Sequence, residues 1–119
     1  MLEIAATDTL YNLNSLNNIS RGNKEFIAKM IEIFIEQTTD VIEKVEIAIS
    51  QNDFIEVSRL IHKIRPGIES LGIITITKEM QLLEKTAKTS NDKEKISALF
   101  FIIRAVLEKA IIQLTIIKK

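Results

Sequence analysis

The sequence predicts an all-α protein, an up-down-up-down four-helix bundle with a short extra helix at its N-terminal end. Apolar residues recur at alternating intervals of three and four over long stretches, which is the spacing of one buried helix face, and no stretch alternates as a strand does. Three glycines and one proline in 119 residues leave few points at which helices can break. Short polar turns, without a linker or a repeat, separate the periodic stretches. We therefore expect a single domain over residues 1–119 with its core at about 10–117.

The first break in the helical pattern is the Ser-Arg-Gly-Asn stretch at 20–23. We expect a short helix at about 13–19, after a loose N-terminus, and a long second helix at about 24–49 that Asn23 caps. The inner stripe of the second helix consists of Ile27, Met30, Ile31, Phe34, Val41, Val45 and Ala48. Further apolar residues widen this stripe, which indicates either burial against two neighbouring helices or an exposed docking strip. The residues of that strip are Phe26, Met30, Ile33 and Gln37.

The third helix is expected at about 54–71, after a polar turn that offers Asn52 or Asp53 as N-cap and before Gly72, which suits a C′ position. Pro66 lies inside this helix, where it removes one hydrogen bond and crowds the carbonyl group four residues earlier. Because the apolar stripe continues in phase beyond the proline, we expect a kinked but continuous helix rather than one that ends before it.

The last two helices follow the same pattern of one apolar stripe each. Thr75 or Thr77 is expected to cap the fourth helix, which extends to about Lys88. The polar stretch at 90–92 then breaks the chain and caps a fifth helix at about 93–117. These two helices complete the predicted bundle.

His62 is the only histidine in the chain. The apolar stripe of its helix consists of Phe54, Val57, Ile61, Ile64, Ile68 and Leu71. At about 100° per residue, His62 projects away from that stripe toward solvent. The residues that share its side are Ser58, Arg59, Arg65, Pro66 and Glu69. An exposed neutral imidazole is a nucleophile, and nearby cations favour an anionic group attached to it.

Composition excludes several classes of function. The 16 basic and 16 acidic residues cancel, which argues against a nucleic-acid binder that relies on a positive field. Zero cysteines exclude disulfides and thiolate metal sites and fit a reducing compartment. A carboxylate-bridged metal enzyme in a helix bundle needs Glu-x-x-His pairs on core faces, and the sequence has none. We therefore expect no metal and no cofactor bound by this domain.

Neither end of the chain nor its interior suggests a membrane segment. Residues 1–3 show no basic region followed by an apolar stretch, so no signal peptide is expected. The most apolar stretch, 96–107, is interrupted by Arg104 and is too short to span a bilayer. Binding to a membrane surface would need a basic amphipathic face that the helices lack. The sequence predicts a cytoplasmic location.

The third helix resembles the signature of histidine-containing phosphotransfer (HPt) domains. That pattern has a histidine, an aliphatic residue two positions on, a basic residue at the third position, small residues next and a glycine ten positions on. Here it is carried by His62, Ile64, Arg65, Pro66-Gly67 and Gly72. Residues 17–27 and 33–37 resemble the family's first turn and second helix, so the resemblance covers about 10–114. Arginine replaces the family's usual lysine and keeps its charge.

The resemblance implies a phosphorelay intermediate. His62 would accept a phosphoryl group from the aspartate of one receiver domain and pass it to the aspartate of another. Arg65 and Lys63 would stabilise the phosphoryl charge, whereas the receiver would supply the acidic pocket and its Mg²⁺. The sequence has no glycine-rich phosphate loop, so we expect no ATP site and no enzyme activity of its own. If the chain were part of a hybrid sensor, the parent protein would be a histidine kinase.

The expected partners are response-regulator receiver domains and a hybrid sensor histidine kinase, bound by a monomer. The expected docking surface surrounds the histidine and consists of Gln37, Ser58, Arg59, Pro66, Gly67 and Glu69. The alternative is a helical-bundle adaptor, including a degenerate HPt domain that docks receivers without being phosphorylated. Labelling of His62 distinguishes these two functions.

Overall fold

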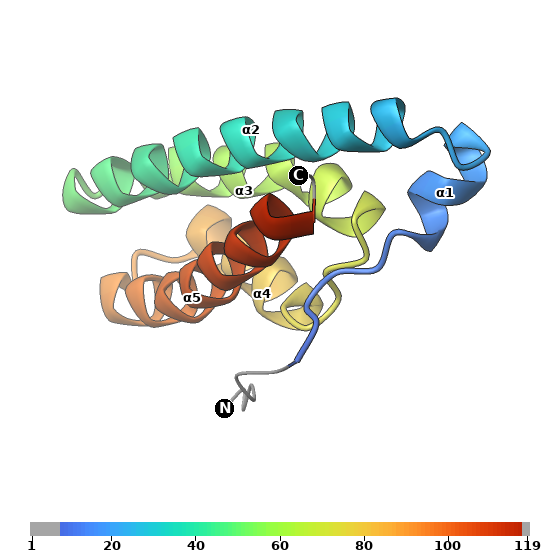
Figure 1. Ribbon diagram of the computed structural model, residues 1–119. Helices are drawn as coiled ribbons and strands as arrows, with labels where there is room; N and C mark the ends of the chain where they lie inside the picture. Colours follow the sequence, from blue (N-terminus) through green and yellow to red (C-terminus); the bar gives the residue numbers. More distant parts are fainter. Residues whose placement is uncertain (1–7, 118–119) are drawn as a thin grey trace.

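The computed structural model describes residues 8–117 and is helical wherever those residues form regular structure (Figure 1). Its helices are α1 (Asn14–Ser20), α2 (Lys24–Ser50), α3 (Phe54–Ser70), α4 (Thr77–Thr89) and α5 (Lys93–Ile117). The predicted all-α class and the five expected helices are confirmed. Residues 1–7 and 118–119, which include the positions used to argue against a signal peptide, lie outside the described residues.

Four of the helices form the bundle. Figure 1 shows α2 to α5 running in alternating directions, with α1 beyond the N-terminal end of α2. Each of the four packs on its neighbour along the chain, and α5 closes the ring by packing on α2. Consequently α3 and α5 occupy opposite corners of the bundle.

The core follows the apolar stripes of the four helices. Its most deeply buried members include Val45, Val57, Ile61, Ile76, Leu83, Ile96, Ile103, Leu107 and Leu114. Burial of each such side chain contributes about 1.5–3 kcal/mol, which fixes the rotation of every helix about its axis. Across residues 8–117, no helix combines the length and the apolar character needed to cross a bilayer.

Side-chain caps start three of the helices. Asn23 accepts a hydrogen bond from the Phe26 amide, and Asp53 accepts one from the Glu56 amide, at N···O distances of 3.1 and 3.3 Å. Asp92 does the same for the amide three residues later. The prediction of a threonine cap for α4 was wrong, because Ile76 occupies the N-cap position and the Thr77 hydroxyl donates instead to the carbonyl oxygen three residues earlier.

Residues 8–13, which precede α1, are packed against the bundle, whereas a loose N-terminus was expected; the rest of that prediction, at 1–7, lies outside the described residues. Leu10 is buried, and its amide donates to Oε1 of Gln113 at 2.9 Å. The Asn12 amide donates to the carbonyl oxygen of Leu71 at 2.8 Å. Gly72 makes this approach possible, since a Cβ atom there would lie 2.5 Å from Cβ of Asn12. The segment thus covers the end of the bundle that carries the turn between α3 and α4.

Replacing Gly72 with alanine is expected to destabilise the fold by about 2 kcal/mol or more. The glycine has a φ of +65° and its Cβ position is already occupied by Asn12, so strain and a clash add together. Gly67→Ala is the matched control, because a Cβ atom there would make an ordinary 3.7 Å contact with Phe34 inside a regular helix. That control should gain about 0.5–1 kcal/mol. Urea unfolding of both variants checks the prediction, and similar midpoints would contradict it.

Candidate functional site around His62

His62 lies on the outer face of α3, as the sequence predicted. Its side chain is 76% exposed, whereas Ile61 and Ile64 on either side are buried in the core. α3 continues through Pro66 to Ser70, which confirms the expected continuous helix. The proline cannot donate the hydrogen bond that the His62 carbonyl oxygen would otherwise accept from the residue four positions on.

The imidazole is held by a carboxylate from the next helix. Nδ1 of His62 lies 2.6 Å from Oε1 of Glu84 on α4. The other carboxylate oxygen accepts a hydrogen bond from Nη1 of Arg65, also at 2.6 Å. Since an ionised carboxylate can only accept, Nδ1 must carry the proton of this hydrogen bond. In a neutral ring the free lone pair is then on Nε2, and the imidazole is open to solvent.

The two hydrogen bonds keep Glu84 ionised. Partial burial raises the pKa of its carboxyl, but the hydrogen bonds from Arg65 and His62, together with their charges, outweigh that effect and place the pKa below its ordinary value. Its backbone is fixed as well, because the Ser58 hydroxyl donates to the Glu84 carbonyl oxygen at 2.9 Å.

Ser58 therefore has a different position from the one expected. It was predicted on the exposed face as a docking residue, but its side chain is buried between α3 and α4. The angular position of a residue on a helix does not reveal that the neighbouring helix covers it. Ser58 holds the α4 backbone beside His62 and does not contribute to an exposed surface.

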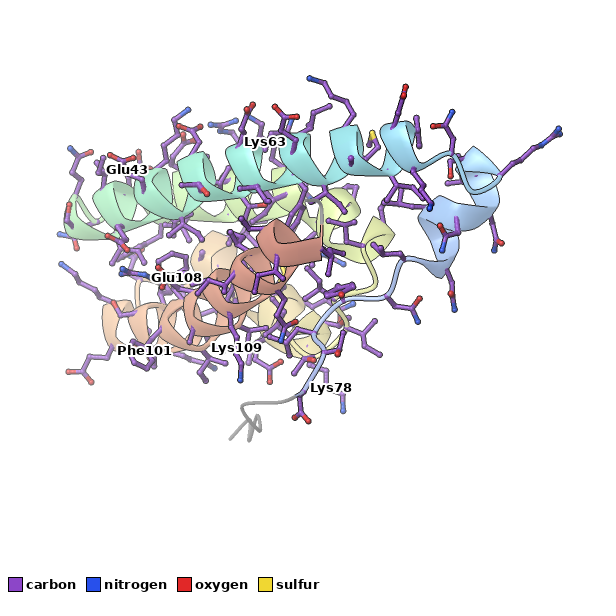
Figure 2. The ribbon with its side chains drawn as sticks, in the orientation of Figure 1. Glu43, Lys63, Lys78, Phe101, Glu108 and Lys109 are labelled. Carbon is purple, nitrogen blue, oxygen red and sulfur yellow. The ribbon has the colours of Figure 1, made fainter. Side chains whose placement is uncertain are left out.

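The three predicted cations lie in different environments. Arg65 is 26% exposed and pairs with Glu84, with a longer 3.6 Å contact to Glu69. Arg59 makes two hydrogen bonds to Glu56, at 2.5 and 2.7 Å. Lys63 is exposed and forms no ion pair among residues 8–117. It is labelled in Figure 2. Lys63 is thus the cation next to His62 that is available to an incoming anion.

A groove runs beside the histidine between α2 and α3. Gly67 and Lys63 form its α3 wall, and Gln37 lies on the α2 side. Its remaining lining residues are Leu16, Met30, Ile33, Phe34, Thr38, Ile64, Ser70 and Leu71. The groove includes three of the four residues of the expected docking strip, and Phe26 is the one it does not include. Pro66 and Glu69 are exposed on the same helix.

Glu84 is the site residue that sequence reasoning missed. It lies 22 positions after His62, beyond the turn that joins α3 to α4. The spacing within one helix cannot show which residue of the next helix faces it, because the turn sets that register. No local pattern around Glu84 distinguishes it from other acidic residues on helix surfaces.

The Hpt domain family model matches residues 29–114. The chain belongs to the Hpt domain family. No curated protein and no solved structure gives a significant match. As an Hpt domain, the chain has a phosphorelay role in two-component signalling, as a type of module that transfers phosphoryl groups without an ATP site. Hpt domains interact with response-regulator receiver domains and with kinases. Within residues 8–117, no group of three or more His, Cys, Asp or Glu side chains is placed to hold a metal ion.

Proposed function

We propose that His62 of this Hpt domain accepts a phosphoryl group from the aspartate of one receiver domain and passes it to the aspartate of another. The observation that carries the proposal is the 2.6 Å contact between His62 Nδ1 and the Glu84 carboxylate on an otherwise exposed ring. This contact leaves the free lone pair on Nε2, in a ring that is open to solvent. An exposed histidine without such a partner would not have a fixed tautomer.

The first transfer needs no proton to leave the histidine. The Nε2 lone pair of His62 forms a bond to phosphorus while the bond to the receiver's aspartate oxygen breaks, and that aspartate leaves as a carboxylate. Nδ1 keeps its proton, so the phosphorylated ring carries a positive charge that the Glu84 carboxylate stabilises.

The second transfer reverses the roles. A carboxylate oxygen of the next receiver forms a bond to phosphorus, the bond to Nε2 of His62 breaks, and its electron pair returns to the ring. The receiver supplies Mg²⁺ and the acidic pocket, and catalysis is mostly positioning and neutralisation of charge.

The cations of α3 take different parts in this proposal. Lys63 meets the phosphoryl oxygens, because it is exposed and forms no ion pair within residues 8–117. Arg65 acts as a positioning residue through Glu84, whose second oxygen it holds. Arg65 also offsets the carboxylate's charge near the phosphoryl group.

Receiver domains are proposed to dock over the groove between α2 and α3. Gly67 has no side chain, Gln37 is exposed, and apolar residues lie between them. A polar centre beside an apolar groove suits a partner that must bind and leave repeatedly. Pro66, Arg59 and Glu69 are exposed on the same helix and are proposed to extend this surface, Glu69 on the side of α3 that faces α4.

A hybrid sensor histidine kinase is the proposed source of the phosphoryl group, by way of its receiver domain. Such partners place the site of action in the cytoplasm. The lack of cysteines in the chain is compatible with that reducing compartment.

The proposal is tested by incubating the chain with a phosphorylated receiver domain and Mg²⁺. We expect label on the chain that is labile in acid and stable in alkali, as a phosphoramidate is and an acyl phosphate is not. Adding a second, unphosphorylated receiver should remove the label. If no receiver from a broad panel labels the chain while several bind it, the chain is a docking module instead.

Removing the Glu84 carboxylate is expected to slow phosphoryl transfer about tenfold. Glu84→Ala removes a charge-assisted hydrogen bond from the ring, whereas Glu84→Gln keeps an oxygen that accepts from Nδ1 and should lose less. Single-turnover transfer measures the rate. ¹⁵N spectra of the imidazole report the tautomer without overlap, because the chain has one histidine.

The matched control is Glu79→Ala, which removes a carboxylate from the same helix away from this contact. It should leave both the rate and the imidazole spectrum unchanged. A slow Glu84→Ala variant with an unchanged tautomer would show that the residue acts through the stability of the bundle rather than through the ring.

A further inference from the structure

Residues 8–13, which we call the strap, cross the end of the bundle before α1 begins (Figure 1). The side chain of Gln113 on α5 holds the backbone of the strap through two hydrogen bonds. Its Nε2 donates to the carbonyl oxygen of Asp8 at 2.6 Å, and its Oε1 accepts from the amide of Leu10 at 2.9 Å. Because one bond needs a donor and the other an acceptor, this pair of bonds suits a side-chain amide.

The strap is also packed into the bundle by its apolar side chains. Leu10 is 5% exposed and belongs to the core, and Tyr11 and Leu13 are partly buried against that core. The Asn12 amide donates to the carbonyl oxygen of Leu71, directly after the last residue of α3. The strap therefore connects α5 to the end of α3, two helices that do not pack on each other as neighbours in the ring.

The strap reaches the proposed receiver-docking groove by two routes. Leu71, whose carbonyl oxygen accepts from the strap, is itself a lining residue of the groove and is 2% exposed. Leu16, a second lining residue, follows the strap on α1 and is 3% exposed. Buried lining residues form the floor of a groove. Since packed interiors leave little free space, a shift of either residue changes the shape that a partner meets.

α1 depends on the strap for its position. It is only seven residues long, and isolated helices of that length are not stable in water. Among the helices it packs chiefly on α2. Its C-terminal end leads through a short turn into α2, whereas its N-terminal end is attached to the bundle through the strap. Release of the strap would therefore free one end of α1, and Leu16 with it.

We propose that Gln113 is a positioning residue for receiver docking, and that it acts through the strap rather than through contact with the receiver. While the strap is attached, Leu16 and Leu71 complete the floor of the groove. When it is released, the groove loses part of that floor. A receiver that binds the attached form more tightly must favour attachment by the same factor. The inference rests on the receiver docking proposed above, but not on phosphorylation of His62.

Gln113→Leu is expected to weaken receiver binding by the full chain about tenfold, as it would if the strap were attached in only about a tenth of the variant molecules. Leucine removes both hydrogen bonds and has a similar size. Gln113→Glu keeps an acceptor for the Leu10 amide but loses the donor to Asp8, so it should lose less. Isothermal titration measures the affinity, with the unphosphorylated receiver that binds the wild-type chain most tightly. The matched control is Gln51→Leu, the same change at an exposed position at the other end of the bundle.

A second measurement reports on the strap itself. Tyr11 is the only tyrosine in the chain, so 3-fluorotyrosine gives a single ¹⁹F resonance from the strap. In Gln113→Leu this resonance should move toward its position in the urea-unfolded chain, while circular dichroism shows that the helices remain. Adding the receiver should move it back toward the wild-type position, because binding favours attachment. A role of Gln113 within α5 alone would leave the resonance unmoved.

Leu10→Ala releases the strap by a different change and should weaken binding in the same way. Combined with Gln113→Leu it should add little, because both act on one attachment. Two results would overturn the inference: a moved Tyr11 resonance with unchanged receiver affinity, or weaker affinity with an unmoved resonance. Gly67→Arg separates this inference from the docking proposal. If Gly67→Arg weakens binding and Gln113→Leu does not, only the role of the strap fails. If neither does, docking at the groove fails as well.

Discussion

Replacing His62 with glutamine is expected to abolish phosphoryl uptake from a phosphorylated receiver domain. Glutamine can still donate a hydrogen bond to Glu84, so the contact between α3 and α4 is largely kept, but its amide nitrogen has no nucleophilic lone pair. Because the side chain is exposed, the free energy of unfolding should change by less than about 0.5 kcal/mol. Acid-labile label on the purified chain measures uptake.

Lys63→Gln is the matched control for that variant. It changes the adjacent exposed residue to the same amino acid and leaves the imidazole in place. We expect it to be labelled, at a lower rate, because the phosphoryl oxygens lose a cation. Label that persists on His62→Gln would mean that another residue is phosphorylated, and the proposed function would fail.

Replacing Gly67 with arginine is expected to lower kcat/KM for transfer from a receiver by about 100-fold, or roughly 2.7 kcal/mol. The new side chain would project from the α3 wall of the groove, one turn beyond Lys63, where the partner is proposed to approach most closely. The bundle itself should tolerate the change, since position 67 is exposed and helical. Most of the loss should be in receiver affinity.

Two variants separate docking from general disturbance of α3. Ile55→Arg adds the same side chain to an exposed position near the start of the helix, far along it from His62. Gly67→Ala adds only a methyl group at the docking position, where it would make an ordinary contact with Phe34. Both should transfer at close to the wild-type rate. If Gly67→Arg does the same, receivers dock elsewhere on the molecule.

Most of the fold was predictable because its determinants are local. Apolar spacing placed α2, α3 and α5 to within about two residues, and Asn23 and Asp53 cap their helices as their side chains suggest. The N-terminal segment was not predictable in this way. Its anchoring depends on Gln113, which lies at the other end of the chain, and on the lack of a side chain at Gly72.

For the candidate site too, features set within one helix were predictable and features set between helices were not. The exposure of His62 followed from its position on one helix, which the sequence specifies. The partner of its ring did not, because Glu84 belongs to the next helix and the turn between them sets which residues meet. The same missing information placed Ser58 at the surface and left Arg65 without Glu84 as its partner. The sequence shows which residues share a side of α3, and pairings between helices required the structure.

The carboxylate of Glu84 joins two helices as well as two side chains, because His62 and Arg65 both extend to it from α3. If phosphorylation strengthens or weakens these hydrogen bonds, the free energy of separating α3 from α4 must change by the same amount. The unfolding midpoint of the bundle then depends on its phosphorylation state. Conversely, a partner that loosens α4 changes the transfer potential of the phosphohistidine without touching it.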